Sequence, residues 1–258
     1  MSVTPLFDFF KRGEVARDVR LLAAQGGLAP RAHEQLSILV FLLDDADPNI
    51  RRTAELTLSR IPAGVLSAFL ARSDVSVGLR EFFADRGVFP AETAAEETDR
   101  PLIEADAPDD PLFGEEESGD RESLVQRLAK MGFPERLKAA TKGSREMRAV
   151  LVRDPNKMIA AAVMSSPKLT ESEVEGIARM ASVSEDVLRI IGANRAWMKN
   201  CKIGAALTRN PKTPVALSMN LLSRLNERDL TQVSVDRNVP EPVRIAARKK
   251  VVAGKSGH

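Results

Sequence analysis

An internal repeat of apolar and small residues constrains the fold of this sequence more than any other feature. Residues 159–163 read Ile-Ala-Ala-Ala-Val, and a Ser-Pro-Lys turn follows at residues 166–168. The pattern returns 44 residues later, as Ile-Gly-Ala-Ala-Leu at residues 203–207 and Asn-Pro-Lys at residues 210–212. A weaker third copy begins 42 residues further on, at Ile245. Because a helical unit of this size buries its apolar face only against its neighbours, the period predicts a stacked helical-repeat protein, an α-solenoid.

The sequence has the pattern of helices over residues 1–90 and again over residues 123–258. Apolar residues recur at spacings of three and four, and the sustained alternation of a half-buried strand is rare. Helix starts are well marked: Asp47 is an N-cap before Pro48, Thr170 and Glu173 fit a capping box, and Ser184 precedes two acids. We therefore predict an all-α protein.

Charge is distributed unevenly along the chain, although the formal net charge is only +2. Residues 1–90 contain 11 basic and 11 acidic side chains, residues 91–125 contain 2 and 13, and residues 126–258 contain 25 and 12. A block of like charge with few large apolar residues buries too little surface to offset chain entropy. We therefore predict helical modules at residues 1–90 and 123–258, joined by a disordered acidic linker over residues 91–122. The linker is also a candidate intramolecular partner for the basic second module.

Several segments resemble known helical-repeat families. Residues 47–54 and 239–247 resemble the opening of the second helix of a HEAT repeat, where an acid or Pro turn precedes a Val/Ile-Arg pair. Residues 208–217 are similar to the Asn-Pro-x-Thr-Pro-x-x-x-Leu phrase of the leucine-rich repeat variant proteins. Residues 153–251 resemble an uncharacterised bacterial family. These resemblances imply a HEAT-like or armadillo-like solenoid and no known activity. The segments shared with the bacterial family begin at Asp154, Val183, Trp197 and Asn210.

Side chains that carry catalysis or bind metals are scarce. The sequence has two His (His33 and His258), one Cys and no Tyr, which excludes a disulfide framework, a Cys-rich metal site and a His-cluster site. The iron–sulfur cluster associated with the leucine-rich repeat variant family is not expected, because Cys201 stands alone. Cys201 shares an apolar stripe with Ile203 and Ala206, so we expect a buried thiol. We predict no enzyme activity and no cofactor.

The candidate interaction surface consists of Trp197 and the basic residues of the second module. Trp197 is the only Trp and lies at a helix break beside Arg195. It is either a packing plug between repeats or an anchor for a partner, since Trp beside Arg is common in interface hot spots. Basic side chains on one face would attract an acidic protein or a phosphate backbone; solvated helix faces are the alternative. The surface comprises Trp197, Arg195, Lys199, Lys202, Arg145, Arg148, Arg153, Lys157, Arg244 and Arg248.

The sequence favours a non-enzymatic scaffold or adaptor for protein partners, built from helical repeats. The alternative is a nucleic-acid-binding solenoid that uses its basic C-terminal face without sequence preference and is regulated by the acidic linker. The scarcity of aromatic side chains for base stacking counts against this alternative. Without an apolar run of about 18 residues or the pattern of a secretion signal, we expect no membrane insertion and a cytoplasmic location.

Overall fold

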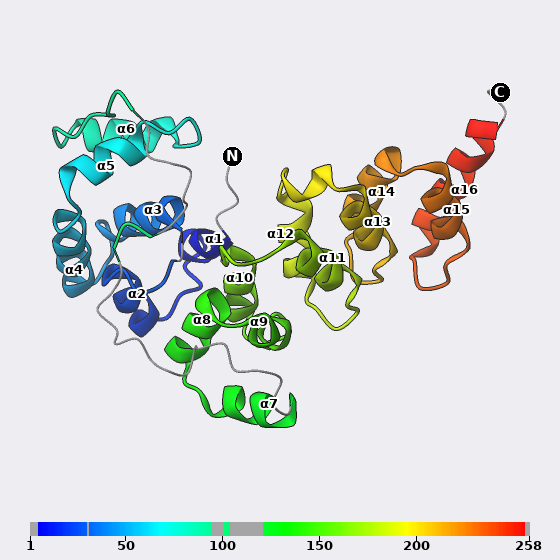
Figure 1. Cartoon of the computed structure of the whole chain (residues 1–258), viewed down its shortest axis with the longest axis horizontal. Helices are drawn as coiled ribbons and strands as arrows, with labels where there is room; N and C mark the ends of the chain where they lie inside the picture. The colour runs from blue at the N-terminus through cyan, green and yellow to red at the C-terminus, as the bar shows by residue number, and fades with distance from the viewer. Residues whose placement is uncertain (1–4, 30, 94–100, 104–120, 256–258) are drawn as a thin grey trace. The chain divides into compact units, whose positions relative to one another are not determined.

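The computed structural model of the chain describes residues 5–29, 31–93, 101–103 and 121–255. Within these residues all regular secondary structure is helical and no strand occurs (Figure 1), which confirms the prediction of an all-α fold. The first helices are α1 (Pro5–Lys11), α2 (Arg17–Ala24), α3 (Ala32–Leu42), α4 (Pro48–Ser59), α5 (Ala63–Leu70), α6 (Val77–Ala84), α7 (Arg121–Lys130) and α8 (Phe133–Lys142). They are followed by α9 (Arg145–Leu151), α10 (Lys157–Ser165), α11 (Glu171–Arg179), α12 (Glu185–Ala193), η2 (Trp197–Lys199), α13 (Cys201–Arg209), α14 (Val215–Leu221), η3 (Leu222–Arg224), α15 (Glu227–Val235) and α16 (Glu241–Lys255).

The chain divides into two compact units. The N-terminal unit comprises Met1–Arg148 together with Ser165–Lys168, and the C-terminal unit comprises Ala149–Met164 and Leu169–His258. The expected module boundary lay at residue 123. The compact units instead divide within α9, so that α7 and α8 belong to the first unit.

Helix α3 is the centre of the N-terminal unit. It packs against α1, α2 and α4, and Leu36, Leu39 and Leu42 on it are fully buried. A helix covered on several sides is apolar over most of its surface, which accounts for the apolar run at residues 36–43. Two polar residues, Glu34 and Gln35, are buried in this helix and need partners.

Gln35 holds a short piece of the segment predicted to be the linker. Its Oε1 accepts hydrogen bonds from the backbone N–H groups of Leu102 (2.8 Å) and Ile103 (3.1 Å). Its Nε2 donates to the carbonyl of Ile103 at 2.7 Å and to that of Gly26 at 3.1 Å. Residues 101–103 therefore have a fixed place on the N-terminal unit, which differs from the disorder expected for them. Residues 94–100 and 104–120 of that segment lie outside the described residues.

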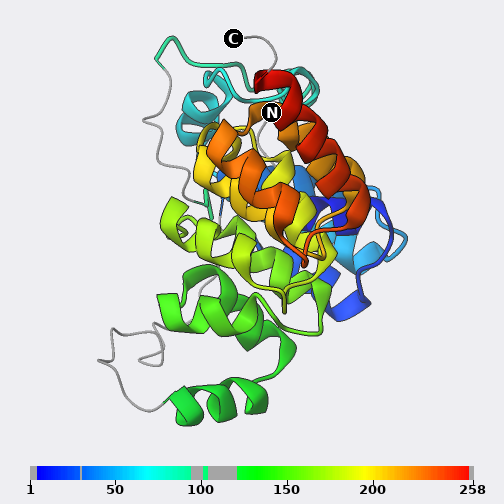
Figure 2. The same ribbon diagram turned by 90° about the vertical axis from the view of Figure 1, so that its right-hand side faces the viewer.

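The C-terminal unit is a series of short helices at a nearly constant spacing. From α10 to α16, successive helices begin at residues 157, 171, 185, 201, 215, 227 and 241, which are 12 to 16 residues apart. Helices two apart in the series pack together: α13 lies between α11 and α15, and α14 contacts α16 (Figures 1 and 2). Apolar side chains of η3, α15 and α16 form one cluster of this stack, including Leu222, Val233 and Val243.

This spacing changes the interpretation of the sequence repeat. An offset of 44 residues relates α10 to α13 and α11 to α14, which are three helices apart, whereas helices two apart in the series begin only 26 to 30 residues apart. The underlying unit is therefore one helix and one turn of about 14 residues, and the period in the forties spans three such units.

Glu34 joins the first helix to α3. One of its carboxylate oxygens accepts the backbone N–H groups of Leu6 (2.7 Å) and Phe7 (3.4 Å) in the first turn of α1. The Ser165 hydroxyl and the charge of Arg31 also favour its ionised form. Burial outweighs these interactions and raises the pKa of Glu34 from 4.5 to about 7.

The raised pKa of Glu34 predicts that acidification stabilises the chain near neutral pH. Between pH 4.5 and 7 the folded state keeps a proton that the unfolded state has lost, so the free energy of unfolding should fall as pH rises through this window, by up to about 3 kcal/mol. Urea unfolding from pH 5 to 8, compared with Glu34→Gln, measures this effect. The slope attributable to Glu34 should be absent in the variant, and identical slopes in the two proteins would contradict the assignment.

Candidate functional site

Helices of the C-terminal unit end in a recurrent turn built by an Asn or Asp side chain. Asn194, Asn210 and Asp236 are the C-caps of α12, α13 and α15, and each has an extended backbone with φ between −79° and −72° and ψ between 108° and 125°. In each, a side-chain oxygen accepts the N–H of the residue two positions on, at 3.0 Å. This turn stops the helix after about nine residues and reverses the chain without requiring a glycine.

Asn210 also links two helices of the stack. It is 2% exposed, and its Nδ2 donates to the carbonyls of Ala178 (2.8 Å) and Met180 (3.0 Å) at the end of α11. Ser166, which the sequence repeat aligns with Asn210, likewise donates to the carbonyl of Thr141 at the end of α8, at 2.7 Å. These side chains satisfy carbonyls that a helix end leaves without an intrahelical partner, and they set the register between neighbours.

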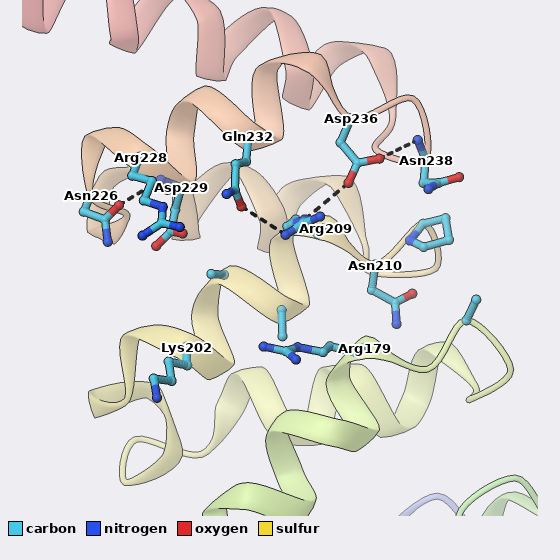
Figure 3. Close-up of a pocket in the computed structure, with 14 residues that line it drawn as sticks. Arg179, Lys202, Arg209, Asn210, Asn226, Arg228, Asp229, Gln232, Asp236 and Asn238 are labelled. Carbon is cyan, nitrogen blue, oxygen red and sulfur yellow. Dashed lines mark hydrogen bonds and ion pairs between the residues drawn. The ribbon is translucent and has the colours of Figure 1, made fainter.

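A groove of about 740 Å³ crosses α11, α13 and α15 (Figure 3). Its lining includes Ala205 and Ala206, which are small residues in the middle of α13. Lys202 and Arg209 are seven positions apart, about two helical turns, and therefore lie on the same face of α13. The groove is lined by Arg179, Ala181, Lys202, Ala205, Ala206, Arg209, Asn210, Pro211, Asn226, Arg228, Asp229, Gln232, Asp236 and Asn238.

Arg209 is hydrogen-bonded to two residues of the groove lining. Its guanidinium donates to Asp236 (3.2 Å) and to the amide oxygen of Gln232 (3.1 Å), both on or next to α15. Asp236 is itself held, because its other oxygen accepts the N–H of Asn238 at 3.0 Å. The arrangement fixes the guanidinium of Arg209 and leaves 16% of the Asp236 side chain exposed.

Lys202 and Arg228 lie at the other end of the groove. Each is the second residue of its helix, and α13 and α15 run in the same direction side by side, so the two cations are placed at the same end (Figure 3). Both side chains are exposed, and within the described part of the chain neither forms an ion pair. The lining has four basic and two acidic side chains in all, which gives it a net positive charge.

Most of the residues predicted from the sequence lie outside this groove. Of the ten candidates, Lys202 alone lines it. Trp197 lies in η2 next to α12 and α13 and is only 9% exposed. This burial agrees with the packing plug and removes Trp197 as a surface anchor.

Arg148 is 4% exposed, and its guanidinium donates to the carbonyls of Gly143 (2.9 Å) and Lys168 (3.3 Å), so its hydrogen bonds are made within the fold. Lys157 pairs with Asp186 at 2.9 Å.

The other predicted basic residues are distributed over several elements. Arg244 is half-buried on α16, and the remaining five are exposed. Those five are Arg145, Arg153, Arg195, Lys199 and Arg248.

Sequence reasoning missed Arg179, Arg209, Arg228 and Asp236 as site residues. One signal was available: Arg179 and Arg209 are the last residues of α11 and α13, 30 positions apart, and mark the same place in two neighbouring helices.

The expectation of a buried thiol is wrong. Cys201 is exposed at the first position of α13, before the apolar face of that helix begins at Ile203. No group of three or more His, Cys, Asp or Glu within the described ranges is arranged to hold a metal ion.

Comparisons with known proteins give no relative: no family model, curated protein or solved structure matches this chain. Among the described helices, none combines the length and apolar composition needed to cross a membrane.

Asn210→Ala should destabilise the chain by about 2–3 kcal/mol, because two carbonyls of α11 and the turn N–H would lose their buried partner. Asn238→Ala is the matched control: Asn238 is exposed on the same groove and should change stability by less than about 0.5 kcal/mol. Urea unfolding measures both. Equal and small effects would show that Asn210 does not hold the helices together.

Proposed function

We propose that this chain is a non-enzymatic interaction protein, a scaffold or adaptor whose C-terminal unit is a HEAT-like α-solenoid. The groove over α11, α13 and α15 is its binding surface for protein partners. The observation that carries this proposal is the composition of the groove, which combines fixed donors, fixed acceptors and two cations without an ion-pair partner in the described chain.

The lining of the groove supports recognition over catalysis. It contains no His, Cys, Ser or Thr, so it lacks the hydroxyl or thiol nucleophile and the imidazole base of the Ser-His and Cys-His enzymes. Of its two acids, Asp236 is held by Arg209 and by the turn N–H of Asn238. A surface that is held rigid by its own bonds loses little freedom when a partner binds.

A second candidate function is binding of nucleic acid. The excess of basic residues in positions 126–258, 25 against 12, favours it. Two observations favour proteins instead. Beyond Phe133 the only Phe, Trp or Tyr is the buried Trp197, so base stacking lacks a platform. Asp229 and Asp236 also place negative charge in the groove, where a phosphate backbone would pass.

The two functions differ in their dependence on salt. Full-length protein would be titrated against random-sequence DNA and RNA at 50 to 200 mM salt, and selected in parallel against a display library of folded protein fragments. We expect selected fragments whose affinity falls by less than about tenfold over this range, and which nucleic acid does not displace. Tight nucleic-acid binding that weakens by about 10³-fold or more, without any selected fragment, would contradict the proposal.

A further inference from the structure

We infer that the groove over α11, α13 and α15 binds an extended acidic peptide segment, with an acidic side chain received between Lys202 and Arg228. This inference rests on the proposed function and names the partner chemistry of the same site.

The two cations at one end of the groove are placed to attract an anion. Lys202 and Arg228 begin adjacent helices, are exposed, and have no acidic partner within the described residues. Asp229 lies at this end as well and pairs with neither. Two like charges placed at the same level of neighbouring helices repel each other, and a carboxylate between them would replace that repulsion with two attractive interactions.

The rest of the groove offers hydrogen-bonding groups of both kinds. Asp229, Asp236 and the amide oxygens accept hydrogen bonds, whereas the amide nitrogens of Asn226 and Gln232 and the guanidinium of Arg209 donate them. A polypeptide backbone presents alternating N–H and C=O groups and can use both kinds, but a phosphodiester backbone presents acceptors alone. The mixed lining therefore selects a peptide over a polynucleotide of similar charge.

The dimensions of the groove set the length of the segment. Packed helices lie about 8–10 Å apart, so a path across the three helices is roughly 20 Å long. An extended chain rises about 3.3 Å per residue, and about six residues would cover this path. At the middle of the path the lining residues are Ala205 and Ala206, whose small side chains leave room for a peptide backbone.

The test selects peptides from a random dodecapeptide display library with the full-length protein and measures the best binder by fluorescence anisotropy. We expect the selected peptides to be enriched in Asp and Glu. The double variant Lys202→Ala/Arg228→Ala should weaken binding by at least about tenfold. Replacing the critical acid of the peptide by its amide should cause a similar loss, and the two changes together should add little.

Lys199→Ala/Arg248→Ala is the matched control. It removes the same net charge from exposed positions outside the groove lining and should change affinity by less than about twofold. Urea unfolding of both double variants checks that they fold as the parent does, as expected for exposed side chains.

Several outcomes would overturn the inference. The inference is contradicted if no peptide is selected, or if the selected peptides show no preference for acids. It is also contradicted if the two double variants weaken binding equally, or if random-sequence DNA at an equal concentration of negative charge displaces the peptide. If folded protein fragments bind and lose affinity in the groove variant, but no acidic peptide is selected, this inference fails while the proposed function stands. If neither fragments nor peptides bind, both fail.

Discussion

The amide of Asn210 is the interaction on which the C-terminal unit depends most directly. Its oxygen closes the turn after α13, and its nitrogen binds two carbonyls at the end of α11. One side chain thus determines both where a helix stops and where it lies on its neighbour. The groove follows from this register, because Arg179 and Arg209 lie beside these helix ends and Lys202 and Arg228 lie at the opposite ends of their helices.

Some helices of the two units end by different chemistry. Among the described residues, a left-handed backbone occurs at Gly13, Gly26 and Gly87, all in the N-terminal unit. In the C-terminal unit, α12, α13 and α15 instead have extended caps closed by the side chains of Asn194, Asn210 and Asp236. An Asn or Asp cap can also bond to a neighbouring helix: Asp236, after α15, accepts a hydrogen bond from Arg209 of α13. The ends of these helices therefore become part of a surface.

The all-α fold and its helix starts could be predicted from the sequence because they depend on local chemistry. Asp47 accepts the N–H of Asn49 at 2.9 Å, and Thr170 forms the expected capping box with Glu173. The length of the repeat was misleading, since the best-matching copies are three helices apart. The site was harder to predict, because the charge on a side chain does not show whether it is buried, as Arg148 is, or exposed, as Arg228 is. Those differences depend on packing between residues distant in the chain.

Native-state hydrogen exchange of the full-length chain tests the central claim, that side chains at the helix ends hold the C-terminal helices as one array. The informative amides are those of Ala196, Lys212 and Asn238, which bind the Asn or Asp side chain two positions earlier. The account predicts that they exchange with the helices they follow, at least about 100-fold more slowly than in an unstructured peptide. Exchange of these amides at the unstructured rate, while α13 and α15 stay protected, would contradict it.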